Sequence, residues 1–287
     1  MKELKLKAYA KINLALDVIG KRPNGYHELR MIMQQIDVYD ELTFEKTEEA
    51  GFTLSCNKET IPTDESNLII KVCKLMFEKF SLPGGMKIHL EKSIPMAAGL
   101  AGGSTDGAAT FKAINEMYSL NLSEDELCEM GVKLGADIPY CIVGGTQLSE
   151  GIGEVLTPVT NKLDPFVLLV KPDVNVSTKY VYESLHMENN PKFDVDVDMC
   201  IDGLQNGDWD ALVDGMGNAL ATVTEAECPR IEEIKNAMMG CGATVAMMSG
   251  SGPSVFGLFE DRLEAEYAYT HIRNQGKEKE IFITKFI

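Results

Sequence analysis

The sequence predicts an α+β protein with two domains, and three observations support this prediction. The first half alternates strand-like and helical segments around a glycine-rich loop at residues 95–106. The apolar pattern restarts at about residue 161. The second half then reads β-α-β-β-α-β, a split β-α-β arrangement, once its middle helices are treated as an insertion. We therefore expect one domain at residues 1–158 and a second at residues 159–287.

Apolar periodicity and turn residues give the elements of the first half in order. Strands are predicted at residues 4–20, 29–36, 39–45, 51–56, 85–91 and 146–150. Helices are predicted at residues 67–80, 108–118 and 123–134. Polar residues that suit a cap precede the first of these helices, and Ser123 with Glu126 three positions later has the pattern of a capping box. Pro23, Asn24 and Gly25 mark the turn between the first two strands.

The second half is richer in helices. Strands are predicted at residues 166–170, 244–248, 255–259 and 281–286. Helices are predicted at residues 177–186, 194–206, 208–222, 229–240 and 263–275. The middle helices of this half carry no motif.

Composition and charge limit the classes of partner. The 287 residues are 45% hydrophobic and 25% charged, which is typical of a globular protein. A net charge of −17 argues against nucleic acid or an anionic membrane surface as partner. No signal peptide or membrane span is expected, and seven scattered cysteines suit the reducing cytoplasm. Residues 1–30 are nevertheless locally basic, which suits an anionic small molecule.

The glycine-rich loop at residues 95–106 lies between a predicted strand and a predicted helix, as phosphate-binding loops do. Glycines let backbone N–H groups approach phosphate oxygens, and the first helical turn offers unpaired donors at the positive end of the dipole. No lysine lies between Gly99 and Thr105, so this is not a Walker loop. The alternative is a tight turn of small residues. If the loop binds ATP, its balancing cation comes from elsewhere in the chain.

Two further positions are candidates for chemistry. Lys11 and Asn13 project from one face of the first strand, which is otherwise apolar. They form either part of a site or the solvent side of an amphipathic strand. Asp137 stands at the entrance to an apolar segment, where it is either a cap or turn residue or a site acid or base.

Two loops could contact a ligand. Tyr26 and His27 follow a turn, where they could stack on and hydrogen-bond a flat ring or merely pack a hairpin. The stretch at residues 249–254 is a second glycine-rich loop, which offers backbone donors or is a mobile surface turn.

These features together suit phosphoryl transfer, in which a protein chiefly positions groups and neutralises charge. Asp137 can accept or orient the proton of an acceptor hydroxyl, and Lys11 can stabilise the developing charge. ATP would bring Mg²⁺, for which the hydroxyl of Ser104 or Thr105 is a candidate ligand.

The chain resembles the GHMP superfamily of small-molecule kinases at three motifs, which are Lys11-Ile-Asn-Leu14, Pro95-x-x-x-Gly-Leu-x-Gly-Gly-Ser104 and Ser249-Gly-Ser-Gly-Pro-Ser254. The resemblance covers the whole chain. It implies a two-domain GHMP kinase fold, with a ribosomal-protein-S5-like N-terminal domain and a ferredoxin-like split β-α-β C-terminal domain.

Three further segments narrow the resemblance, namely Ala8-Tyr-Ala-Lys-Ile-Asn-Leu14, Arg22-Pro-Asn-Gly-Tyr-His27 and Gly135-Ala-Asp-Ile-Pro139. They imply ATP-dependent phosphorylation of a hydroxyl on a cytidine-diphosphate-linked polyol in non-mevalonate isoprenoid biosynthesis. One alternative is another GHMP kinase, acting on homoserine, mevalonate or a sugar. Another is a non-catalytic nucleotide-binding protein that keeps the fold.

The resemblance also implies residue roles. Lys11 and Asp137 become the catalytic pair. The residues expected at ATP are Pro95, Met96, Ala97, Ala98, Gly99, Leu100, Ala101, Gly102, Gly103, Ser104 and Thr105, with Asn67, Leu68 and Lys92 near the adenosine. The residues expected at the acceptor are Asn13, Tyr26, His27, Tyr182 and Thr178, with His27 reading the cytosine edge. No dedicated metal site is implied, because Mg²⁺ would arrive with ATP.

Two residues depart from the family's usual pattern, and a third, Asp106, carries a charge that needs an explanation. Ala101 replaces a frequent glycine, which implies that this position does not need a positive φ. Gly107 is expected in the first turn of the loop's helix, where alanine is commoner. Asp106 suits a helix N-terminus but would repel a triphosphate, so we predict that its carboxylate turns away from the ligand.

Overall fold

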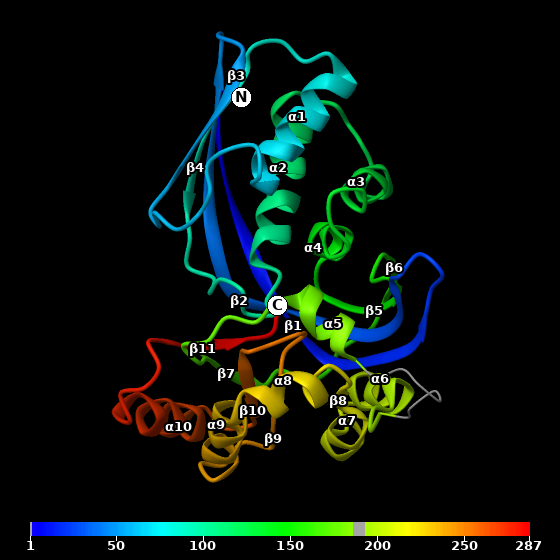
Figure 1. Cartoon of the computed structure of the whole chain (residues 1–287), viewed down its shortest axis with the longest axis vertical. Coiled ribbons are helices and arrows are strands. Elements are labelled where there is room, and N and C mark those ends of the chain that lie inside the picture. Colours follow the sequence, from blue (N-terminus) through cyan, green and yellow to red (C-terminus); the bar gives the residue numbers. More distant parts are fainter. Residues whose placement is uncertain (1, 186–192) are drawn as a thin grey trace. The chain divides into compact units, whose positions relative to one another are not determined.

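The computed structural model describes residues 2–185 and 193–287 (Figure 1). Its mixture of helices and sheets confirms the α+β class. Contacts divide the chain into two compact units: unit 1 is Met1–Ala10, Val38–Ile94 and Ala101–Gly144, and unit 2 is Lys11–Asp37, Pro95–Leu100 and Gly145–Ile287. The long strands β1 (Glu3–Lys21) and β2 (His27–Thr47) contribute residues to both units. The domain boundary after residue 158 stays a prediction.

Unit 1 combines strands with four helices. The second half of β2 pairs antiparallel with β4 (Gly85–Glu91), and β4 pairs in parallel with β3 (Gly51–Cys56). Figure 1 shows the four helices on one side of these strands; they are α1 (Leu68–Phe80), α2 (Gly102–Met117), α3 (Glu124–Gly131) and α4 (Ile138–Val143). The strands therefore have one face that the helices cover, as their alternating apolar residues require.

Side-chain caps fix two of these helix starts as the sequence predicts. Asn67 is the N-cap of α1, where its side-chain oxygen accepts a hydrogen bond from the Ile69 N–H. Ser123 and Glu126 form the predicted capping box of α3, with both reciprocal hydrogen bonds present.

Unit 2 holds a second sheet, in the strand order β11-β7-β10-β9, with antiparallel neighbours throughout. Its elements are β7 (Phe166–Lys171), α9 (Pro229–Met239), β9 (Val245–Met248), β10 (Val255–Phe259), α10 (Arg262–Asn274) and β11 (Glu280–Lys285). Figure 1 shows α9 and α10 together against this sheet, and their buried residues share one core with it. This is the predicted split β-α-β arrangement.

The remaining elements of unit 2 extend from the long strands. β5 (Thr146–Gly151) pairs with the first half of β2 and with β6 (Val155–Pro158). β8 (Gly217–Asn218) pairs in parallel with β1. The helices between β7 and α9 are α5 (Thr178–Ser184), α6 (Val197–Asn206), α7 (Trp209–Gly215) and α8 (Ala221–Glu227).

Several predicted elements differ from the structure. The strands expected at 29–36 and 39–45 form the single strand β2, because no glycine or proline interrupts them. The helix expected at 208–222 is broken into α7, β8 and α8 near Gly215 and Gly217. Helix α2 begins at Gly102 rather than at residue 108. The helix expected at 177–186 ends at Ser184, and residue 186 lies outside the described residues.

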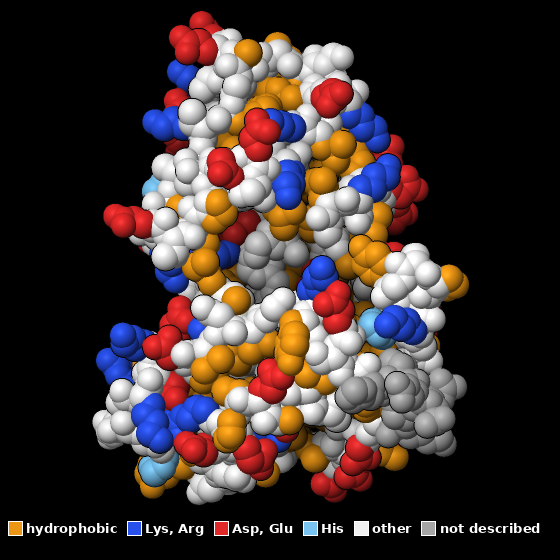
Figure 2. Space-filling view, in the orientation of Figure 1, with side chains coloured by type: hydrophobic (Ala, Val, Ile, Leu, Met, Phe, Trp, Pro, Cys, Tyr) orange, Lys and Arg blue, Asp and Glu red, His pale blue; other side chains and the backbone are white. Residues whose placement is uncertain are grey.

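Two surface properties bear on partners. Within the described residues, no helix is both long and apolar enough to cross a bilayer. Figure 2 shows acidic and basic side chains interspersed over the face that it draws. The excess of negative charge is therefore not gathered into one patch on this face.

Candidate active site

The backbone of the glycine-rich loop alternates in a way that suits an anion. Ala97, Gly99 and Ala101 have φ angles of 47°, 73° and 56°, all in the left-handed region. Such alternation turns N–H groups toward a common concavity. Our expectation that Ala101 does not need a positive φ is wrong. An L-residue in this conformation costs roughly 1–2 kcal/mol, so the surrounding structure must hold Ala101 there.

Helix α2 begins directly after this strained residue. Ala101 occupies the N-cap position and makes no side-chain hydrogen bond to the helix. The first N–H groups of α2 therefore have neither an intrahelical partner nor a side-chain cap from Ala101. A Cβ atom added to Gly103 would meet only Leu68 Cδ1, at 3.8 Å, which places the start of α1 beside the start of α2. This end of α2 has the form of a phosphate-binding helix terminus.

Lys11 supplies a cation beside the loop. Its side chain is buried, and its ammonium donates hydrogen bonds to Asn13 Oδ1 at 2.7 Å and to the Gly99 carbonyl oxygen at 3.1 Å. Asn13 is 1% exposed, and its amide in turn contacts Met31 Sδ at 3.6 Å. The predicted common face of Lys11 and Asn13 is confirmed, and it is not the solvent side of the strand. The lysine that the loop lacks thus comes from β1.

The second glycine-rich loop, residues 249–254, packs against the first. Ser249 is fully buried, and its hydroxyl donates to the Gly99 carbonyl oxygen at 3.1 Å. A Cβ atom added to Gly99 would lie 2.1 Å from the Ser249 carbonyl oxygen, so only glycine permits this approach. A Cβ atom added to Gly250 would lie 3.4 Å from Lys11 Nζ. These close contacts exclude a mobile surface turn.

Lys92 lies in unit 1, just before the glycine-rich loop, and forms a buried ion cluster there. It is 4% exposed, and its ammonium donates to Asp40 Oδ2 at 2.5 Å, to Asp106 Oδ2 at 2.6 Å and to the Gly102 carbonyl oxygen at 3.0 Å. These acceptors use all three donors of the ammonium. Asp40 Oδ1 also accepts from the N–H groups of Ser93 and Ile94. The end of β4 and the start of α2 are therefore tied through one buried ion cluster.

The charges of this cluster shift its pKa values. Burial raises the pKa of Asp106 well above its ordinary value, since it outweighs the opposing effect of Lys92, and Asp40 adds to the rise. Burial lowers the pKa of Lys92, but Asp106 and Asp40 more than compensate and raise it overall. The Asp106 carboxylate is directed at Lys92, and its second oxygen has no hydrogen-bond partner among the described residues. The position of Lys92 near adenosine stays a prediction.

The loop hydroxyls and the cap of α1 have distinct surroundings. Thr105 is buried, and its hydroxyl donates to the Tyr9 carbonyl oxygen at 2.8 Å. Ser104 is half-buried, which makes it the more accessible of the two hydroxyls. Asn67 uses its side-chain oxygen for the cap of α1 and its amide for the Pro62 carbonyl oxygen. Its contact with adenosine therefore stays a prediction.

Asp137 is the N-cap residue of α4, but its carboxylate does not cap the helix. The residue is half-buried, and Pro139 stands in the first turn of α4. A Cβ atom added to Gly135, two residues earlier, would lie 3.9 Å from Ser104 Oγ. The segment that carries Asp137 therefore adjoins the start of α2. Because the carboxylate is not used as a cap, it is available for other chemistry.

His27 and Tyr182 meet in unit 2 although they are distant in sequence. Their rings are stacked with centroids 5.2 Å apart and an interplanar angle of 29°. His27 is 6% exposed, and its buried Nε2 has no hydrogen-bond partner among the described residues. Burial, with a smaller effect of Lys21, lowers the pKa of His27. A neutral ring with an unpaired nitrogen suits recognition of a polar heterocycle edge.

The other predicted acceptor residues differ in exposure. Tyr26 is 56% exposed, and its N–H is bonded to the Asn24 side chain. Thr178 begins α5, and its hydroxyl lies 2.8 Å from the Ser251 hydroxyl. Thr178 therefore contacts the second glycine-rich loop, and the sequence motifs alone do not predict this contact.

Sequence reasoning missed Asp40 and Asn218. Asp40 occupies a core-facing position of β2, in phase with the buried residues Val38, Leu42 and Phe44. A carboxylate in that phase is a signal that alternation alone could have provided. Asn218 donates to the carbonyl oxygens of Met248 and Gly250. It was hidden inside a predicted helix, although the glycines before it indicated a break.

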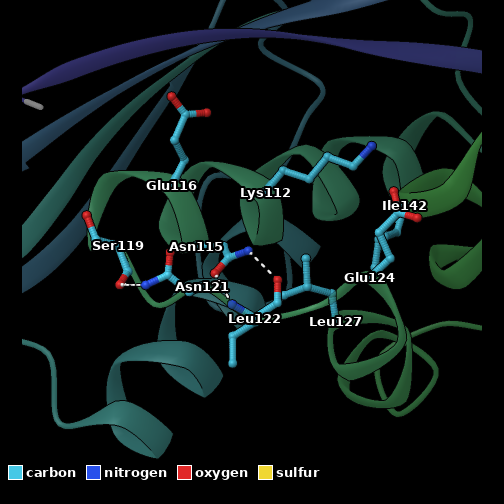
Figure 3. A pocket seen from close by; sticks show the side chains of 9 residues that line it. All are labelled: Lys112, Asn115, Glu116, Ser119, Asn121, Leu122, Glu124, Leu127 and Ile142. Carbon is cyan, nitrogen blue, oxygen red and sulfur yellow. Dashed lines mark hydrogen bonds between the residues drawn. The ribbon is translucent and has the colours of Figure 1, made fainter.

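A separate pocket of about 550 Å³ lies in unit 1, and none of the predicted site residues lines it (Figure 3). It is lined by Lys112, Asn115, Glu116, Ser119, Asn121, Leu122, Glu124, Leu127 and Ile142. Figure 3 shows Asn115 bonded to Leu122, so its amide closes the loop after α2. Its lining includes one lysine and two glutamates, which is not a set of groups for a polyphosphate.

Comparisons with known proteins identify the family and the fold. Residues 67–145 match the family model "GHMP kinases N terminal domain", and residues 200–278 match "GHMP kinases C terminal". A solved 4-(cytidine 5'-diphospho)-2C-methyl-D-erythritol kinase has a TM-score of 0.83 and 29% identity, covering 99% of both chains. Homoserine kinase from Cytophaga hutchinsonii, at 18% identity and a TM-score of 0.80 over 99% of this chain and 95% of that one, shares the fold.

Two relatives are similar over nearly their full length. A 4-diphosphocytidyl-2-C-methyl-D-erythritol kinase of Lachnoclostridium phytofermentans is 47% identical, with 99% of this chain and 97% of the relative covered. The enzyme of the same name from Clostridium beijerinckii is also 47% identical, over 99% and 100%. The chain belongs to the 4-diphosphocytidyl-2-C-methyl-D-erythritol kinase family within the GHMP kinases.

Proposed function

We propose that this protein transfers the γ-phosphoryl group of ATP to the 2-hydroxyl of 4-diphosphocytidyl-2-C-methyl-D-erythritol, a step of non-mevalonate isoprenoid precursor biosynthesis. Family membership supports the substrate, since the relatives carry that name. The structural observation that carries the proposal is the buried Lys11 ammonium, bonded to the carbonyl oxygen of Gly99 in the glycine-rich loop. A fixed cation at such a loop is what phosphoryl transfer requires.

The reaction would proceed by in-line displacement. The acceptor oxygen forms a bond to the γ-phosphorus, and the bond from that phosphorus to the bridging oxygen of ADP breaks. Asp137 accepts or orients the hydroxyl proton, and Lys11 stabilises the charge that develops on the transferred group. The carboxylate of Asp137 supports this role because it makes no cap hydrogen bond.

Nucleotide binding is assigned to the loop at residues 95–105 and the start of α2. The positive φ angles and the uncapped helix N-terminus support phosphate contacts. Mg²⁺, carried with ATP, would neutralise phosphate charge. Among the residues that the structure describes, no group of three or more His, Cys, Asp or Glu side chains could hold a metal ion. Phosphate oxygens would thus be its main ligands, and the accessible hydroxyl of Ser104 is the protein group best suited to help.

Acceptor recognition is assigned to Asn13, Tyr26, His27, Thr178 and Tyr182. The unpaired Nε2 of His27 supports a hydrogen bond to the cytosine edge, and the adjacent Tyr182 ring supports stacking. We place the reaction in the cytoplasm, which the seven free cysteines support, and expect neither nucleic acid nor membrane as partner.

A coupled assay of ADP formation tests the proposal. ADP should form rapidly with diphosphocytidyl-methylerythritol and slowly without it. Homoserine, mevalonate and sugars should give no comparable rate, and thermal shift should favour cytidine diphosphates over these compounds. Rapid phosphorylation of homoserine, mevalonate or a sugar would contradict the assignment. So would a rate of ADP formation that does not depend on the acceptor.

The variant Asp137→Asn tests, in the same assay, whether Asp137 acts as the general base. Its turnover should fall by roughly 10²–10⁴ if Asp137 acts as a base. Asp208→Asn is the matched control, because Asp208 is also a helix N-cap and asparagine caps equally well. Near-normal turnover of Asp137→Asn would remove the base assignment while leaving the substrate assignment intact.

A further inference from the structure

Asn218 lies in the two-residue strand β8, which fixes its backbone. Leu16 of β1 is its partner in the parallel pairing, and the next residue, Ala219, donates its N–H to the Leu16 carbonyl oxygen at 2.9 Å. The Asn218 side-chain oxygen accepts the Leu220 N–H at 3.0 Å. Hydrogen bonds therefore fix both the backbone around Asn218 and its side-chain oxygen. The amide group of Asn218 consequently points in a defined direction.

The amide group of Asn218 holds the second glycine-rich loop. Its Nδ2 donates to the Met248 carbonyl oxygen at 2.9 Å and to the Gly250 carbonyl oxygen at 2.8 Å. A primary amide has two N–H donors, and both are used on carbonyls two residues apart. A carboxylate of the same shape would instead place negative charge against two carbonyl oxygens.

The held loop borders Lys11. A Cβ atom added to Gly250 would lie 3.1 Å from the Gly99 carbonyl oxygen, 3.3 Å from Asn13 Oδ1 and 3.4 Å from Lys11 Nζ. Ser249, between the two carbonyls that Asn218 binds, shares the Gly99 carbonyl oxygen with Lys11. A shift of this loop would therefore move the acceptor that fixes the ammonium.

We propose that Asn218 is a positioning residue for phosphoryl transfer, which holds the second glycine-rich loop so that the Lys11 ammonium stays in place. The inference rests on the proposed function, in which Lys11 is catalytic. Asn218 acts through the loop and touches no reacting atom. A displacement of about 1 Å at such a group costs roughly 10²-fold in rate.

The test compares Asn218→Asp and Asn218→Ser with Thr222→Ala. Thr222 lies in the same segment, and its hydroxyl donates to the Ala219 carbonyl oxygen at 2.8 Å, so its hydrogen bond stays within the segment. Both Asn218 variants should lower kcat by roughly 10–100-fold with little change in KM for ATP. In the nucleotide-free protein, amide hydrogen exchange of residues 248–252 should be faster in both variants than in the wild type. Thr222→Ala should change neither quantity.

A double-mutant cycle with Lys11→Met separates positioning from general destabilisation. If Asn218 acts through Lys11, Asn218→Ser should lower kcat much less in the Lys11→Met background than in the wild type. Equal factors in both backgrounds, or unchanged exchange of residues 248–252, would overturn the inference. Wild-type kcat in Lys11→Met would instead overturn the catalytic role of Lys11 in the proposed function, and the positioning role with it.

Discussion

Lys92 and Asp106 form an ion pair of 2.6 Å in the interior of unit 1, with side chains that are 4% and 6% exposed. Asp40 completes the cluster from β2, fully buried and 2.5 Å from the same ammonium. Two carboxylates thus share one lysine at the entry to the glycine-rich loop. The cluster accounts for an aspartate in a helix that is proposed to bind phosphates, since Lys92 offsets its charge.

Removal of the lysine should destabilise the protein strongly. Lys92→Met leaves Asp40 and Asp106 buried without a counter-ion, so the free energy of unfolding should fall by about 3–5 kcal/mol. Lys87→Met is the control, because Lys87 is an exposed lysine of β4, the strand that ends just before Lys92. Urea denaturation at constant m measures both variants. An equal, small effect in the two would refute the importance of the cluster.

Asp106→Asn should stabilise the protein, and the size of this effect should depend on pH. The pKa of Asp106 is raised in the folded protein, so the ionised form is disfavoured there. Its contribution to stability is complete below the ordinary value of 3.8 and is lost as pH rises through the raised value. Asparagine does not titrate. The stability of Asp106→Asn relative to wild type should therefore increase from pH 4 toward pH 8, as measured by urea unfolding at each pH; a constant difference would contradict this.

Gly250→Ala should impair catalysis through crowding. Gly250 has a φ of 56°, and an added methyl group would press on the Gly99 carbonyl oxygen, Asn13 and Lys11. We expect kcat to fall by roughly 10²-fold, because the ammonium would shift. Gly276→Ala is the control: its φ is 69°, but an added Cβ atom would meet nothing within 4 Å. If steady-state assays give both variants the same loss, backbone strain rather than Lys11 is responsible.

Gly107→Ala should stabilise the protein. Gly107 lies inside α2, beyond its first turn, and an added Cβ atom would make ordinary contacts of 3.5–3.8 Å with Ile138, Leu68 and Val72. Alanine is favoured over glycine in a helix by up to about 1 kcal/mol. Gly203→Ala in α6 should instead destabilise, since its Cβ atom would lie 2.3 Å from the Leu212 nitrogen. Thermal unfolding should shift in opposite directions for the two; a lower Tm for Gly107→Ala would be inconsistent with the packing described.

Acceptor binding should depend on the neutral form of His27. Burial lowers its pKa below the ordinary 6.5, so the ring stays neutral at pH 7. KM for the acceptor should be flat from pH 8 to pH 6.5 and should rise only at lower pH. His27→Phe should raise it roughly 10–100-fold, since a hydrogen bond to the buried ligand edge is lost. KM for ATP serves as the internal control, and a parallel rise would show that the effect is not specific to the acceptor.

Local sequence predicted much of this protein for physical reasons. Alternating apolar residues indicate strands, and the caps at Asn67 and Ser123 depend only on neighbours in the chain. Strand alternation placed Lys11 and Asn13 on one face, as observed. The helix predicted at residues 208–222 is interrupted near Gly215 and Gly217, because glycine weakens a helix even where apolar periodicity favours one.

The sequence by itself determined the α+β class, most elements and the family, since these depend on local pattern and on motifs. Tertiary structure alone decided which distant groups meet: Ser249 and Lys11 on the Gly99 carbonyl oxygen, Tyr182 on His27, and Asp40 with Asp106 on Lys92. It also decided that Ala101 adopts a positive φ. These outcomes depend on packing between segments far apart in the chain, and packing of that kind leaves no periodic trace in the sequence.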